Sequence, residues 1–176
     1  MGLVSGGQDL SSRTTDRRMN QQGSINGSAV EVRLKETRVA RLATRDPQGR
    51  PHVVPVCYVY DGEAFYTPLD RKPKRASRGE LARVRNIRAN PEVALLLDQY
   101  DEDWTKLWYI LIRGSCEMLS VGEERKKAVE LLRKKYPQYA SRELLPDEAM
   151  VIRVTPEKVV SWGQEESHGG TESTEK

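Results

Sequence analysis

The sequence has few of the residues on which metal and thiol chemistry depend. It contains two cysteines, Cys57 and Cys116, and two histidines, His52 and His168. No C-x-x-C or H-E-x-x-H spacing is present, so we predict no metal site. Both cysteines lie in apolar, strand-like runs, which favours buried thiols in a reducing compartment. A disulfide or a nucleophilic thiol is the alternative.

Long apolar runs are also missing. Nothing approaches the roughly 18 consecutive apolar residues of a membrane-spanning helix, so we expect no membrane partner. Residues 1–20 lack the apolar core of a secretory signal, which makes the cytoplasm the expected compartment. Ser-His-Asp, Cys-His and paired-carboxylate arrangements do not stand out, so no residue of the protein is assigned a catalytic role.

The 176 residues suffice for one domain with a core and are too few for two ordinary domains. Residues 1–28 are rich in Gly, Ser, Gln, Asn and Arg, and residues 164–176 are polar and acidic. Both segments are expected to be disordered, because neither buries enough apolar surface to offset its ordering entropy. The expected domain covers residues 29–163.

Turn signals and hydrophobic periodicity divide this domain into short elements. Asp46-Pro47-Gln48-Gly49 and Asp61-Gly62 are typical of tight turns, and the three strands that they join are predicted to form a meander. The predicted elements are helix 31–36, strands 39–44, 51–60 and 64–67, helix 78–89, strands 93–98 and 108–119, helix 121–136, and strands 150–154 and 158–162. This order predicts a mostly antiparallel barrel with helices packed outside it.

The positive charge of the chain is concentrated in one segment. The formal net charge is +3, but residues 71–88 hold eight Lys or Arg and a single acid, Glu80. This segment follows a predicted strand end, residues 65–70, which would bring a hydroxyl, backbone amides and several cations to one place. Such a group suits a phosphate, because charge-assisted hydrogen bonds are about twice as strong as neutral ones. A solvated loop followed by an exposed helix is the alternative.

Several short motifs are more specific together than each is alone. They are Arg50-Pro51-His52-Val53-Val54-Pro55-Val56, Phe65-Tyr66-Thr67, Arg85-Asn86-Ile87-Arg88-Ala89-Asn90-Pro91 and Arg113-Gly114-Ser115-Cys116. In order and spacing they resemble the pyridoxamine 5′-phosphate oxidase-like split-barrel superfamily. Asp101-Glu102-Asp103-Trp104 and Ser161-Trp162-Gly163 are similar to the branch often assigned to the deazaflavin coenzyme F420. The resemblance covers about residues 31–163.

The resemblance implies a split β-barrel of six to seven antiparallel strands, mainly β with flanking helices. It also implies a homodimer whose cofactor lies in a groove between the subunits. The implied cofactor-binding residues are Val53, Val54, Pro55 and Val56 beside the ring, Tyr66, Thr67, Lys72 and Lys74 at or beside the phosphate, and Arg83 and Arg85 as further phosphate ligands. Trp108, like Trp104 and Trp162, is expected to cover the ring or the substrate pocket, with ordinary packing as the alternative.

The function implied by the resemblance is that of an oxidoreductase that uses F420 for hydride transfer to a small organic substrate, with FMN as the alternative cofactor. Asp70-Arg71-Lys72-Pro73-Lys74 stands where pyridoxamine phosphate oxidases commonly carry Ser-Arg-Lys, so their activity is not expected. A non-catalytic cofactor- or haem-binding barrel is a second class, although His52 is the one histidine of the expected domain. Nucleic-acid binding through residues 71–88 is a third, and the lack of interleaved aromatic residues argues against it.

Overall fold

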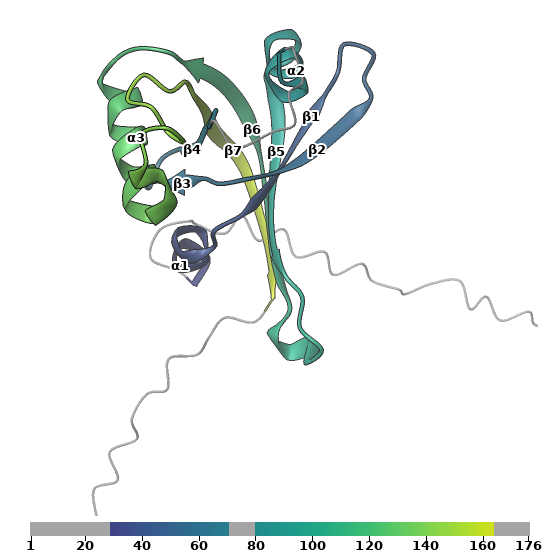
Figure 1. The fold of residues 1–176 in the computed structure, drawn as a ribbon. Coiled ribbons are helices and arrows are strands. Elements are labelled where there is room, and N and C mark those ends of the chain that lie inside the picture. The colour runs from purple at the N-terminus through teal and green to yellow at the C-terminus, as the bar shows by residue number, and fades with distance from the viewer. Residues whose placement is uncertain (1–28, 71–79, 164–176) are drawn as a thin grey trace, which may run out of the picture.

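The computed structural model describes residues 29–70 and 80–163, and all bounds below refer to that part of the chain. Seven strands form one antiparallel sheet in the order β2-β1-β5-β6-β7-β4-β3 (Figure 1). The strands are β1 (Ala40–Arg45), β2 (Pro51–Val56), β3 (Val59–Tyr60), β4 (Phe65–Pro68), β5 (Glu92–Gln99), β6 (Trp108–Leu119) and β7 (Val151–Gly163). The helices are α1 (Ala29–Glu36), α2 (Ala82–Ala89) and α3 (Glu123–Lys135), with short 3-10 turns at η1 (Trp104–Lys106) and η2 (Pro137–Ala140). The predicted split-barrel class is confirmed.

Both predicted turns form, and in each an aspartate organises the backbone. The Asp46 carboxylate accepts hydrogen bonds from the N–H groups of Gln48 and Arg50, each at 2.9 Å. Gly49 follows with a φ of +80°, a conformation that a residue with a side chain rarely adopts. Asp61 accepts from the N–H of Ala64 at 3.0 Å in the second turn. These contacts are local, which explains why the turns are visible in the sequence.

The predicted meander is wrong, because the segment predicted as one strand over 51–60 is divided between two edges of the sheet. Its first part, β2, pairs with β1, and its second part, β3, pairs with β4. These two hairpins lie at opposite edges of the sheet order, so the link at Cys57 and Tyr58 joins the two edges. Curling of the sheet through this link makes it a barrel rather than an open layer (Figure 1).

The link is held by a side chain from a distant part of the sequence. The N–H of Tyr58 donates to the hydroxyl of Tyr136 at 3.0 Å. The same hydroxyl lies 2.7 Å from the carbonyl oxygens of Tyr58 and of Arg38, to either of which it donates. Tyr136 directly follows α3. Its hydroxyl makes the hydrogen bonds that a neighbouring strand would otherwise make with the backbone of Tyr58. Satisfying these buried backbone groups lets the chain leave one edge of the sheet and join the other.

The two closing strands predicted at 150–154 and 158–162 are one continuous strand, β7. Thr155-Pro156 was expected to separate them, since proline supplies no backbone donor. Instead, the pairing of β6 with β7 shifts by one residue between Arg113 and Gly114, which face Lys158 and Pro156. A Cβ atom at position 114 would overlap the carbonyl of Thr155. The β-bulge and the glycine together allow the strand to continue past the proline.

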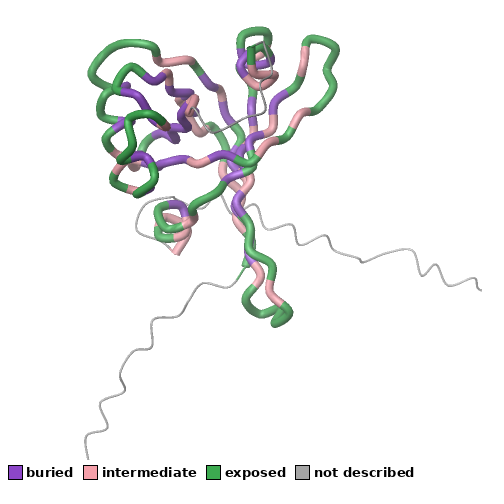
Figure 2. The backbone as a smooth tube through the Cα atoms, viewed as in Figure 1, coloured by how far each residue is buried: buried purple, intermediate pink, exposed green. Residues whose placement is uncertain are grey.

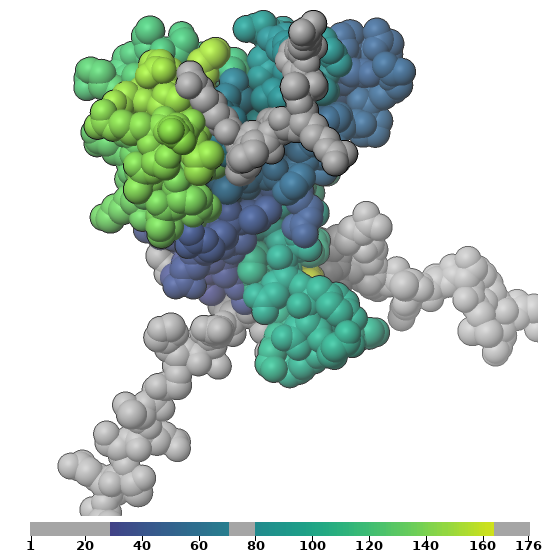
Figure 3. All heavy atoms as spheres, in the orientation of Figure 1, coloured from purple at the N-terminus to yellow at the C-terminus, as the bar shows by residue number. Residues whose placement is uncertain are grey.

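Two apolar clusters hold the helices and strands together. One fills the barrel and includes Leu42, Leu95 and Ile112, and the other lies beneath α3, where Ala128 and Leu132 are buried. Figure 2 shows buried segments along the central strands, whereas the tip of the β5–β6 hairpin is exposed. That hairpin projects from the body of the domain (Figure 3). Within residues 29–70 and 80–163, no helix is long and apolar enough to cross a membrane.

Candidate functional site

The end of β4 carries the first group of candidate residues. Thr67 is buried. It lies on the barrel face of the strand with Phe65, because side chains two residues apart share a face. Asp70 follows the strand and is the last described residue before the basic stretch at 71–79. The hydroxyl of Tyr139, from η2, donates to the Asp70 carboxylate. This contact joins the strand end to the segment that follows α3.

Arg83, in the first turn of α2, reaches the same place. Burial lowers the pKa of its guanidinium, and the nearby Asp70 and Tyr139 oppose that shift. The Nε of Arg83 is buried and has no hydrogen-bond partner among the described residues. An unused donor on a half-buried cation is costly in free energy, so this position is suited to an anion.

Cys57 completes the arrangement from the link between β2 and β3. Burial, the Asp70 carboxylate and the neighbouring Cys57 together raise the pKa of Tyr139. We call Cys57, Asp70, Arg83 and Tyr139 the strand-end cluster. Its members come from the barrel link, the end of β4, α2 and η2. Sequence analysis identified Arg83 but missed Tyr139 and the role of Cys57, because no local pattern links them.

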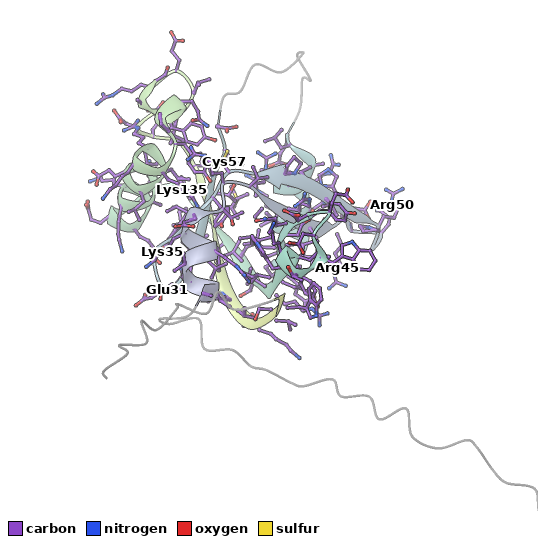
Figure 4. All side chains as sticks on the ribbon, turned by 90° about the horizontal axis from the view of Figure 1, so that it is seen from below. Glu31, Lys35, Arg45, Arg50, Cys57 and Lys135 are labelled. Carbon is purple, nitrogen blue, oxygen red and sulfur yellow. The ribbon has the colours of Figure 1, made fainter. Side chains whose placement is uncertain are left out.

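Lys135 borders the strand-end cluster at the end of α3. Its Nζ is buried 4.1 Å from the centre of the Tyr58 ring and has no hydrogen-bond partner among the described residues. Burial and the nearby Arg38 lower the pKa of Lys135 to about 8, while Cys57 opposes that shift. Cys57 and Lys135 lie near each other in Figure 4, well away from Arg45 and Arg50 at the β1–β2 hairpin. The region around the cluster therefore holds two cations, Arg83 and Lys135, at low exposure.

The predicted residues of β2 divide between the two faces of the strand. Val54 and Val56 pack into the barrel core, and Val56 directly precedes Cys57. Val53 and Pro55 point outward, and Val53 is 58% exposed. The strand thus presents one pair toward the core beside the cluster and the other pair toward the outside of the sheet.

Three other predicted residues lie apart from the strand-end cluster. Tyr66 faces α3, and its hydroxyl donates to Glu124 at 2.9 Å. Arg85 is exposed on α2. Trp108 pairs with Gly163 at one end of β7, whereas Thr67 pairs with Ile152 near the other end. Lys72 and Lys74 lie outside the described residues. Within one chain, the described structure therefore places Arg83 near Asp70, which follows the strand of Thr67, and leaves Trp108 at the other end of β7.

The outward face of the sheet forms a second feature. Pro55, Arg41, Leu96, Leu111 and Val160 follow one another across β2, β1, β5, β6 and β7 in register. On the same face, the rings of Tyr109 and Trp162 stack with their centres 6.1 Å apart, and Trp162 is 54% exposed. Two ion pairs, Arg41–Asp98 and Arg45–Glu92, lie on this face beside the apolar side chains. A mixture of aromatic and apolar side chains with arginines is typical of protein–protein contacts. Among the described residues, no group of His, Cys, Asp or Glu could hold a metal ion.

Comparisons with known proteins place this fold in a family. A curated relative, the 5a,11a-dehydrotetracycline/5a,11a-dehydrooxytetracycline reductase of Streptomyces rimosus, is 29% identical over 75% of this chain and 79% of its own. The structure of the heme storage protein HutZ from Vibrio cholerae matches with a TM-score of 0.59 and 17% identity, over 76% of this chain and 91% of HutZ. An F420 reductase structure matches with a TM-score of 0.54 and 23% identity, over 74% and 94% of the two chains.

Because these two structures are less than 25% identical to this chain, they support the fold alone. The family model described as pyridoxamine 5′-phosphate oxidase matches residues 27–163, a range that contains the whole sheet and all three helices. The chain therefore belongs to the pyridoxamine 5′-phosphate oxidase family of split barrels.

Proposed function

We propose that this protein is an oxidoreductase that binds the deazaflavin F420 and uses it to reduce a small organic substrate. The observation that carries the proposal is the buried, unpartnered Nε of Arg83 beside the end of β4. In this arrangement the guanidinium would donate to the phosphate of the cofactor, and Thr67 would line the same strand end. Lys72 and Lys74, which follow immediately in the sequence, would add further cations.

The donor set fits a phosphate better than a neutral ligand. Arg83 offers a fixed fork of N–H donors that matches phosphate geometry. Asp70 would repel an anion, but Tyr139 donates to this carboxylate and Arg83 lies close to it, which reduces the repulsion. When bound, the deazaflavin or flavin would supply the hydride chemistry, while the protein binds and orients it.

A homodimer is part of the proposal. The outward sheet face, with Val53 and Trp162 more than half exposed, would be covered by a second copy of the chain. A two-fold contact would also allow Trp108 of one subunit to contribute to a groove that contains the strand-end cluster of the other. Val53 and Pro55, which point outward from β2, would then border the cofactor ring in that groove.

The relatives favour a reductase, and they leave the cofactor to be tested. The dehydrotetracycline reductase and the F420 reductase are both named for reductions. FMN is the main alternative cofactor, since it shares the tricyclic ring and a phosphate on a ribityl chain. The haem alternative is supported by the fold likeness to HutZ. His52 is the one histidine in the described residues, so this part of the chain offers a single candidate for an axial haem ligand, which disfavours the haem alternative.

The test is a titration of the protein with F420 and with FMN, in which binding is measured from the change in the absorption spectrum of the cofactor. We expect tighter binding of F420, and we expect Arg83→Glu to weaken the binding by roughly 1.5–3 kcal/mol, the strength of a charged hydrogen bond. Arg50→Glu makes the same change in net charge at the β1–β2 turn and should leave the affinity unchanged. Unchanged affinity in Arg83→Glu would remove the phosphate assignment, and tighter FMN binding at every salt concentration would make FMN the cofactor.

A further inference from the structure

Helix α2 places one polar side chain in its buried face. Val84 and Ile87 pack toward the barrel as predicted, but between them Asn86 is only 1% exposed. Its Nδ2 donates to the hydroxyl of Thr44 on β1 at 3.0 Å. The Thr44 hydroxyl lies 3.4 Å from the carbonyl of His52, its partner on β2, to which it donates. A chain of hydrogen bonds thus runs from α2 through β1 to β2.

An asparagine is an unfavourable choice for this position if apolar packing is its only role. Its Oδ1 is buried and has no hydrogen-bond partner among the described residues, which is a penalty that a leucine would avoid. What the amide adds is direction, because a hydrogen bond weakens steeply with angle whereas apolar contacts do not. The bond to Thr44 therefore adds a directional constraint on the rotation of α2 and on its height above β1, beyond the packing of Val84 and Ile87.

Apart from the burial of Val84 and the ion pair of Arg88 with Glu80, few side-chain contacts fix the first turn of the helix. Its N-cap residue, Leu81, makes no side-chain capping bond, and the first turn contains no acidic residue. Arg83 lies in that turn, three residues before Asn86, so the two side chains share one side of the helix. A rotation of α2 that broke the Asn86–Thr44 bond would also displace the guanidinium from the strand-end cluster.

We propose that Asn86 is a positioning residue that acts through Arg83: it anchors α2 to β1 so that the guanidinium is held at the phosphate end of the cofactor site. This inference rests on the proposed function, in which Arg83 donates to the cofactor phosphate. The inference gives Asn86 a role in cofactor affinity. If the residue served stability alone, its burial and its bond to Thr44 would have no effect on that affinity.

The test compares each cofactor with its phosphate-free core: F420 with its deazaflavin–ribitol core, and FMN with riboflavin. Asn86→Leu removes the bond while filling the volume, and Thr44→Val removes the acceptor hydroxyl in a nearly isosteric way. In both variants we expect affinity for the phosphorylated cofactor to fall roughly threefold to tenfold, a fraction of one charged hydrogen bond. Affinity for the core should change by less than about twofold. Thr105→Val, at an exposed threonine of η1, is the matched control and should change neither.

A double-mutant cycle with Arg83→Ala separates the possible failures. If Asn86 acts through Arg83, its substitution should add almost nothing once Arg83 is gone. If Arg83→Ala leaves the preference for the phosphorylated cofactor intact, the proposed function fails. If Arg83→Ala abolishes that preference but Asn86→Leu and Thr44→Val preserve it, the positioning role is refuted. Equal loss of affinity for cofactor and core would also refute it, by showing a general structural role; if Asn86→Leu does not fold, Thr44→Val decides.

Discussion

Removal of one hydroxyl, in Tyr136→Phe, should destabilise the barrel at its closure. The ring of Tyr136 is buried, and Arg38 lies over it at 5.0 Å, a contact that phenylalanine would keep. The hydroxyl, in contrast, is the partner of the Tyr58 N–H at 3.0 Å and of a carbonyl at 2.7 Å. Ladder pairing stops at Val56 on one side and resumes at Val59 on the other, so no strand takes over these bonds.

The magnitude follows from the groups left behind. A buried donor or acceptor that loses its partner costs about 1–3 kcal/mol. The Tyr58 N–H has no other partner in the ladder, whereas the carbonyl groups of Tyr58 and Arg38 shared a single proton. We therefore expect a loss of about 2–4 kcal/mol in the free energy of unfolding. For a domain whose total stability is on the order of 5–15 kcal/mol, this is a large fraction.

Urea unfolding followed by circular dichroism, at fixed protein concentration, measures this loss. With a slope of about 2 kcal/mol per molar urea, the midpoint should fall by roughly 1–2 M. Tyr100→Phe is the matched control, because Tyr100 is 70% exposed and its hydroxyl should matter by less than about 0.5 kcal/mol. A midpoint for Tyr136→Phe that coincides with that of the control would refute the role of the hydroxyl in closing the barrel.

Two further predictions concern charge and assembly. Since the pKa of Lys135 is lowered from 10.5 to about 8 in the fold, the unfolded chain binds more protons between these values, and stability should rise with pH across that window. Relative to Lys135→Met, the wild-type protein should therefore gain stability from about pH 8 to 10.5, and a constant difference over that range would contradict the buried amine. For assembly, light scattering at micromolar concentration should report a dimer, which for an obligate contact buries on the order of 2,000 Å² or more. Val53→Lys on the outward sheet face should weaken it, whereas Val121→Lys, at a residue that is 79% exposed beside α3, should not; a monomeric wild-type protein would remove the intersubunit groove.

The sequence by itself determined the features that depend on neighbours in the chain. The turns at Asp46–Gly49 and Asp61–Gly62 form through contacts of a few residues, and alternation places β6 at Trp108–Leu119, as predicted. Helical periodicity likewise identified the buried face of α3, although the helix begins at Glu123, after Gly122, and ends at Lys135. The motifs between residues 50 and 116 resembled those of the family that the comparisons confirmed. Each of these signals lies within a short stretch of the sequence, as a turn, as the periodicity of one strand or helix, or as a motif of a few residues.

Only the tertiary structure decided how these elements meet. A strand pattern over 51–60 contains no sign that Tyr136, 78 residues after Tyr58, replaces the neighbouring strand at the link. Nor does Pro156 by itself indicate that Gly114, on another strand, leaves room for β7 to continue. The strand-end cluster has the same origin, because Tyr139 meets Asp70 from 69 residues away. Contacts of this kind depend on the shape of the whole barrel, since the partners share no local periodicity and become neighbours only when the sheet closes.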